Sequence, residues 1–99
     1  MTSPFNWQQA LQDNVPELMK HVNEIRRETG ADGALPAKTK TLMMLLGDAI
    51  LGHADGVANI ARQARSAGIS DKEISETVEI AFMMGGLPAL ITASNAFRG

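Results

Sequence analysis

Apolar residues recur along the chain at the three- and four-residue intervals of amphipathic helices, and no stretch alternates as a convincing strand does. Val57, Ala61 and Ala64, for example, are spaced to lie on one helical face. The pattern predicts helices over residues 4–13, 16–29, 36–51 and 53–67, a fifth from residue 70 to a break at 85–88, and a short one over 89–97. The sequence therefore predicts an all-α fold.

Local signals set the ends of these helices. Pro16 ends the first helix, because the residue before a proline avoids the helical conformation. Gly68 is a typical helix stop. Ser70 and Glu73 are spaced as a capping box, in which each side chain accepts a hydrogen bond from the other's backbone N–H. Gly-Gly-Leu-Pro at residues 85–88 is expected to interrupt the fifth helix.

The third predicted helix, residues 36–51, is apolar almost all the way round. Its apolar residues are Leu42, Met43, Met44, Leu45, Leu46, Ala49, Ile50 and Leu51. A helix with this pattern is buried on more than one side. In a chain of 99 residues with few large aromatic side chains, a second subunit is the expected source of the extra cover. We therefore expect a homo-oligomer.

Composition excludes several classes of function. The chain has no cysteine, so thiolate nucleophiles, disulfides, iron–sulfur clusters and cysteine zinc sites are excluded. The formal net charge is −2 and no basic cluster occurs, so nucleic acid is not an expected partner. The longest apolar run, Leu42–Leu46, is far shorter than the ~20 residues of a membrane span, and the start does not resemble a signal peptide. We expect one domain over residues 1–99, in the cytoplasm and without a membrane partner.

Three pieces of the chain carry a resemblance to a known family. They are Leu-Pro-Ala-Lys-Thr-Lys-Thr-Leu at residues 35–42, Ala-Gly-Ile-Ser-Asp-Lys-Glu-Ile at 67–74, and Gly-Gly-Leu-Pro-Ala at 85–89. In this order and spacing, the chain resembles the carboxymuconolactone decarboxylase and alkylhydroperoxidase D-like family. The resemblance implies a compact all-helical fold around an antiparallel helix pair, assembled as a homotrimer or homohexamer.

The resemblance also implies where chemistry would lie, but the residues that perform it are absent. The peroxidase-like branch uses a Cys-x-x-Cys-x-x-x-His motif and an earlier glutamate; the decarboxylase branch lacks the cysteines and keeps a Glu and a His. The cysteine positions fall on His53 and Gly56, the histidine position on Ile60 and the earlier glutamate position on Thr41. In the decarboxylase branch the two positions again fall on Gly56 and Ile60. Thiol peroxidase activity is excluded, and neither known site is carried over.

His53 is the remaining candidate for catalysis, and Asp48 and Asp55 flank it. A histidine beside a carboxylate can act as a general acid and base, although near a helix start it can equally be solvated and idle. Asp48 lies in a nearly apolar helix, where a carboxylate needs a partner such as Lys40, Arg62 or a neighbouring subunit. The spacing of the three candidates matches no established metal motif, so neither a metal nor another cofactor is predicted.

Two functions stay open at this level. In the first, the chain is an enzyme of the decarboxylase or lyase type, and His53 transfers protons on a small carboxylate or lactone bound between helices. In the second, it is a non-catalytic oligomeric binding or scaffold protein on an inherited enzyme fold. The retained histidine favours the first, and the loss of every family site residue favours the second.

Overall fold

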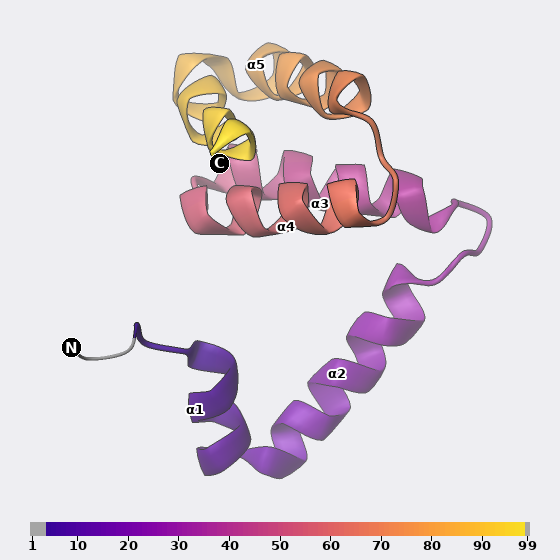
Figure 1. Ribbon diagram of the computed structural model, residues 1–99, viewed down its shortest axis with the longest axis vertical. Helices are drawn as coiled ribbons and strands as arrows, with labels where there is room; N and C mark the ends of the chain where they lie inside the picture. The colour runs from indigo at the N-terminus through magenta and orange to yellow at the C-terminus, as the bar shows by residue number, and fades with distance from the viewer. Residues whose placement is uncertain (1–3, 99) are drawn as a thin grey trace. The chain divides into compact units, whose positions relative to one another are not determined.

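The computed structural model describes residues 4–98, which form five α-helices and a 3₁₀ helix (Figure 1). They are α1 (Trp7–Asn14), α2 (Pro16–Gly30), α3 (Ala37–Leu51), α4 (Ala54–Ser66), α5 (Asp71–Ala93) and η1 (Ser94–Phe97). No strand occurs among residues 4–98. The predicted all-α fold is confirmed, and the predicted ends of α2, α3 and α4 lie within one residue of the observed ends.

The chain forms two compact units, one ending at Ala31 and the other beginning at Asp32. The first unit holds α1 and α2, and the second holds α3, α4, α5 and η1. Asp48, His53 and Asp55 all belong to the second unit. A single domain over residues 1–99 stays a prediction.

In the first unit, α1 and α2 contact each other. Pro16 lies in the first turn of α2, where its missing N–H leaves no helical hydrogen bond unmade. Met19 is the buried residue of these two helices. Leu18 and Ile25, which belong to the apolar stripe of α2, are 57% and 61% exposed. This unit by itself therefore leaves most of the stripe of α2 uncovered.

In the second unit, a hydrophobic core lies between α3, α4, α5 and η1. The core residues are Leu45, Ala49, Val57, Ala61, Ala64, Ile69, Ile74, Val78, Ala81, Ala93 and Ala96. More than half of them are alanines, whose small side chains let the helices approach closely. Leu45, Val57 and Ile74 are the largest fully buried side chains, so they contribute most of the volume of a thin core.

A tight turn joins α3 to α4 and reverses the chain. Gly52, at the end of α3, has a φ of 80°, a left-handed conformation that glycine adopts without strain. Its N–H donates to the carbonyl of Ala49 at 3.3 Å, and the N–H of His53 donates to the carbonyl of Asp48 at 2.8 Å. The turn thus satisfies carbonyls at the end of α3, and α4 runs antiparallel beside α3 (Figure 1).

The predicted capping box at the start of α5 is confirmed. Ser70 Oγ accepts a hydrogen bond from the Glu73 N–H at 3.1 Å, and the Glu73 carboxylate accepts one from the Ser70 N–H at 3.0 Å. The same carboxylate lies 2.5 Å from Lys38 Nζ in the first turn of α3. Farther along, a Cβ placed on Gly85 would lie 3.6 Å from Ile50 Cγ1. These two contacts show that α3 and the first part of α5 run parallel.

The interruption predicted in α5 is also confirmed. Gly86 has a φ of 70° and a ψ of −161°, so the helix bends there, and Pro88 has no N–H to donate to the preceding turn. The prediction of a last helix over residues 89–97 is wrong in its bounds. Helical structure resumes directly after Gly86 and tightens to a 3₁₀ helix at Ser94.

By length and composition alone, residues 71–97 could cross a membrane, and 22% of the most apolar window is buried within the structure. A single helix of this kind is weak evidence for a membrane span, and Ile74, Val78 and Ala81 are core residues. Polar residues and glycines interrupt the segment, so it does not stand out as one long apolar run. The absence of a membrane partner stays a prediction.

The helices α3 and α5 leave many large apolar side chains exposed. Phe82 follows Ile74 and Val78 at four-residue intervals, but it is 48% exposed whereas those two are buried. With it, the following residues form what we call the α3–α5 apolar set: Met43, Met44, Ile50, Leu51, Ile80, Met83, Met84, Leu87 and Ile91. A second subunit is expected to cover this set, and the oligomeric state stays a prediction.

Candidate functional site

The turn between α3 and α4 brings two of the three predicted site residues together. Asp48 lies in the last turns of α3, and His53 is the N-cap residue of α4. Asp48 Oδ1 and His53 Nδ1 are 2.9 Å apart, which is a hydrogen-bonding distance. The short turn through Gly52 fixes this approach, because it folds the start of α4 back onto the end of α3.

The hydrogen bond determines which nitrogen of His53 is free. An ionised carboxylate only accepts hydrogen bonds, so the ring proton is on Nδ1, and this N–H donates the hydrogen bond to Asp48. In the neutral ring, Nε2 is then the nitrogen with a free lone pair. The side chain of His53 is 57% exposed and that of Asp48 is 26% exposed. A ligand can therefore reach the ring, while the carboxylate that orients it is half-buried.

Within the chain, Asp48 has a different partner from the cations expected from the sequence, Lys40 and Arg62. Its side chain is hydrogen-bonded to His53, and Arg62 donates a hydrogen bond to Asn59. A contact of Asp48 with a neighbouring subunit stays a prediction. Asp48 thus meets the requirement that a carboxylate in an apolar helix be paired, and its partner is the catalytic candidate.

The third candidate, Asp55, has a different partner. Its Oδ1 accepts a hydrogen bond from Arg98 at 3.0 Å, and its side chain is 91% exposed. Arg98 also donates to the carbonyl of Ala54 at 3.3 Å. These bonds connect the C-terminal segment to the first turn of α4. The structure does not bring Asp55 into the hydrogen bond between Asp48 and His53.

Gly56, in the first turn of α4, also lies beside the pair. In the sequence it stood out only as the position where the family's cysteine or glutamate is missing. A Cβ placed on Gly56 would lie 2.6 Å from Asp48 Oδ2, 2.9 Å from its Cγ and 3.2 Å from its Oδ1. The carboxylate thus lies directly against the backbone of α4. The available signal was a glycine inside a helical pattern, where it is less stable than alanine.

Metal ligands do not gather in the part of the chain that the structure describes. No group of three histidine, aspartate or glutamate side chains within residues 4–98 is arranged to hold an ion. Asp48 and His53 form a pair, and Asp55 faces Arg98. A hydrogen-bonded aspartate–histidine pair is an arrangement that can bind and release a proton.

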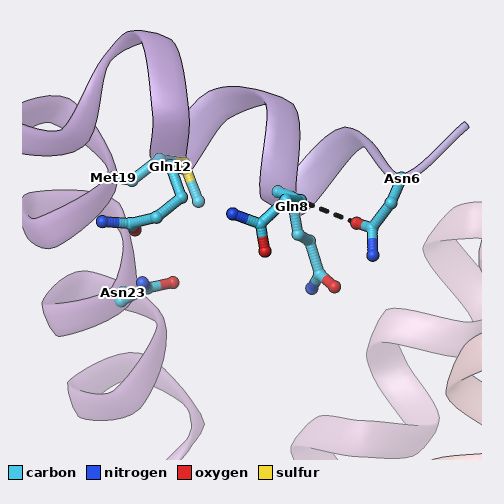
Figure 2. Close-up of a pocket in the computed structure, with 6 residues that line it drawn as sticks. Asn6, Gln8, Gln12, Met19 and Asn23 are labelled. Atoms are coloured by element: carbon cyan, nitrogen blue, oxygen red, sulfur yellow. Dashed lines mark hydrogen bonds between the residues drawn. The ribbon is translucent and has the colours of Figure 1, made fainter.

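A separate groove lies in the first unit, between α1 and α2 (Figure 2). It has a volume of about 310 Å³ and is lined by Asn6, Gln8, Gln9, Gln12, Met19 and Asn23. Asn6 also caps α1, since its Oδ1 accepts a hydrogen bond from the Gln9 N–H at 3.1 Å. The lining has amide donors and acceptors but no group that titrates near neutral pH, and none of the predicted site residues lies in it.

These observations define a class of protein: an all-α chain without cysteine, with an aspartate–histidine pair at the junction of two antiparallel helices. The model of the carboxymuconolactone decarboxylase family matches residues 16–99, and the chain belongs to that family. Comparisons with curated proteins and with solved structures found no match. The resemblance inferred from the sequence is thus confirmed, and because the chain has no cysteine, its membership does not extend to thiol chemistry.

Proposed function

We propose that this family member catalyses a non-redox proton transfer of the decarboxylase or lyase type on a small carboxylate or lactone. The observation that carries the proposal is the 2.9 Å hydrogen bond between Asp48 and His53. His53 Nε2 is the proton-transferring atom, and Asp48 orients the ring and stabilises its charged form. No metal, redox cofactor or thiol enters this chemistry.

The chemical step follows from the free lone pair on Nε2. Nε2 removes a proton from the carbon beside a carbonyl group, and the electron pair of the broken C–H bond moves to the carbonyl oxygen. The positive charge that the ring gains is stabilised by the carboxylate hydrogen-bonded to Nδ1. In a decarboxylation, the bond between the carbon and the carboxylate breaks instead, carbon dioxide leaves, and the electron pair of that bond moves to the carbonyl oxygen. The ring, protonated from solvent beforehand, then gives its proton to that carbon as the carbonyl re-forms. Both reactions need one histidine and one orienting carboxylate.

The family and the exposure of His53 support a small substrate of this class. The chain belongs to the carboxymuconolactone decarboxylase family. The ring of His53 is 57% exposed, so a small ligand can reach Nε2 without any other side chain having to move.

The test is an ultraviolet assay for the loss of a carboxymuconolactone-type substrate with wild type, His53→Ala and His21→Ala. His21 is the matched control, since it is the other histidine of the chain and lies in α2. We expect turnover by wild type and His21→Ala, and a loss of about 10²-fold or more in His53→Ala. Equal turnover by all three would show that His53 is not the proton-transfer residue.

The second candidate function is a non-catalytic, homo-oligomeric binding or scaffold protein of the cytoplasm. The observation that favours it is the α3–α5 apolar set, in which Met83 and Met84 are 77% and 71% exposed. Large exposed apolar areas mark interaction surfaces, and a homotrimer or homohexamer would cover them. Under this alternative, wild type has no turnover on the lactone, and His53→Ala leaves the mass of the assembly unchanged in light scattering.

A further inference from the structure

Gly56 occupies a position where its backbone conformation does not require glycine. The glycines with positive φ in the described chain are Gly52, Gly68 and Gly86, so Gly56 has a backbone that any residue can adopt. A glycine in a helix is also less stable than an alanine. A structural reason for glycine at this position would therefore lie in the space around its Cα.

The space beside Gly56 is filled by the carboxylate of Asp48. Three atoms of that group would lie 2.6, 2.9 and 3.2 Å from an added Cβ, all well inside ordinary contact distance. Because Cγ is among them, turning the carboxylate about its own axis cannot relieve the contact. The whole group would have to shift away from Gly56, and this shift disturbs the hydrogen bond between Oδ1 and His53 Nδ1.

We propose that Gly56 is a positioning residue for the Asp48–His53 hydrogen bond: only a residue without a side chain at position 56 leaves room for the carboxylate to reach the ring. The effect of Gly56 on catalysis rests on the proposed function, in which His53 transfers protons. Its effect on the hydrogen bond does not depend on that function. Any side chain at position 56, whether apolar, thiol or carboxylate, excludes Asp48 from His53. The hydrogen bond and a side chain at position 56 are therefore mutually exclusive in this fold.

The chain offers a matched control in Gly47. It lies in α3, one residue before Asp48, and nothing lies within 4 Å of a Cβ placed there. Gly47→Ala therefore adds the same methyl group to the same pair of helices without contacting the carboxylate. An effect of Gly56→Ala that Gly47→Ala does not share comes from the space beside Asp48.

The first measurement is the tautomer of His53, read from the ¹⁵N chemical shifts of its ring in wild type, Gly56→Ala, Gly47→Ala and Asp48→Ala, at a pH where the ring is neutral. We expect the form protonated at Nδ1 in wild type and Gly47→Ala. We expect its loss in Gly56→Ala, to the level of Asp48→Ala. A Gly56→Ala protein that keeps the wild-type ¹⁵N shifts would overturn the proposal.

The second measurement is the melting temperature of the same variants and of the double variant Asp48→Ala/Gly56→Ala. In the wild-type background, the substitution Gly56→Ala is expected to lower the melting temperature by about 4 °C or more. In the Asp48→Ala background, the same change is expected to raise it, because alanine is the better helix former once the carboxylate is gone. If Gly56→Ala fails to fold, the double variant is expected to fold. A decrease in both backgrounds would overturn the proposal.

The two measurements do not depend on turnover. If the sign of the Gly56→Ala effect reverses and His53→Ala keeps full activity, Gly56 positions the pair but the proposed function is wrong. If Gly56→Ala keeps the wild-type tautomer and His53→Ala loses activity, the proposed function stands and the role of Gly56 is wrong.

Discussion

Lys38 and Glu73 form an ion pair of 2.5 Å that connects the first turn of α3 to the first turn of α5. The pKa of Glu73 is lowered from 4.5 to about 2, mainly by the hydrogen bond from Lys38 and then by those from the Ser70 backbone and hydroxyl. One carboxylate thus closes the capping box of α5 and pairs with a lysine of the neighbouring helix. The ion pair and the cap are coupled through it.

The lowered pKa predicts how stability depends on pH. Since the pKa is lower in the folded state than the unfolded value of 4.5, ionised Glu73 stabilises the fold above about pH 4.5. This stabilisation is lost as the pH falls from about 4.5 through about 2. In Lys38→Ala, the pKa of Glu73 is expected to rise towards 4.5, so the loss of stability over this pH range should be smaller. The measurement is the urea midpoint between pH 2 and pH 7.

The control for this prediction is Lys72→Ala, which removes a lysine from the same turn as Glu73 but not the pairing lysine. It should keep the pH dependence of wild type. If Lys38→Ala and wild type lose stability in parallel between pH 4.5 and pH 2, Lys38 is not the main cause of the lowered pKa.

Leu45 is a test of how much the thin core contributes to stability. Its side chain is fully buried, and Leu45→Ala is expected to lower the free energy of unfolding by about 2–5 kcal/mol. Leu51, in the same helix, is 70% exposed, so Leu51→Ala is expected to change it by less than about 1 kcal/mol. Urea denaturation of both variants gives the comparison. A large loss in Leu51→Ala that depends on protein concentration would mean that a second copy covers this residue.

The two aspartates near His53 are expected to differ in their effect on activity. Asp48→Asn keeps the size of the side chain but removes the charge that stabilises protonated His53, so kcat should fall by about 10²-fold or more. Asp55→Asn alters only the contact with Arg98 and should keep kcat within about twofold of wild type, as expected for an exposed pair. The measurement is the kcat of wild type, Asp48→Asn and Asp55→Asn from steady-state kinetics. An equal loss in both variants would place Asp55 in the catalytic machinery after all.

Self-association is expected to depend on the α3–α5 apolar set. Met83→Glu introduces a charge at its most exposed member, and burying an unpaired carboxylate in an interface is unfavourable. We expect a smaller particle in light scattering than for wild type. Gln63→Glu places the same charge on an exposed position of α4 and should leave the mass unchanged. Identical masses for all three proteins would argue against this apolar set as the interface.

The features that the sequence predicted correctly are determined by neighbouring residues. Ser70 and Glu73 form a capping box through bonds that span three residues, so their identities suffice. The bend at Gly86 follows in the same way from a Gly-Gly-Leu-Pro segment. The three- and four-residue spacing of apolar positions likewise located α2, α3 and α4, because helical periodicity is a local property.

The features that the sequence did not predict depend on how helices meet. The sequence indicated Asp48 and His53 as candidates but not the hydrogen bond between them, because only the left-handed turn at Gly52 brings the two side chains together across the helix end. The exposure of Phe82 depends on which face of α5 meets α3, and two neighbouring faces are both apolar. The space beside Gly56 depends on a side chain from another helix. Periodicity carries no information on such contacts.

The hydrogen bonds from Arg98 to Ala54 and Asp55 have a practical consequence for making the protein. They hold the end of the described chain beside the residue that follows His53. A purification tag or reporter fused after this segment would begin next to the candidate site and could compete with a ligand for it. Material for activity and binding assays is therefore better prepared without a fusion after this segment.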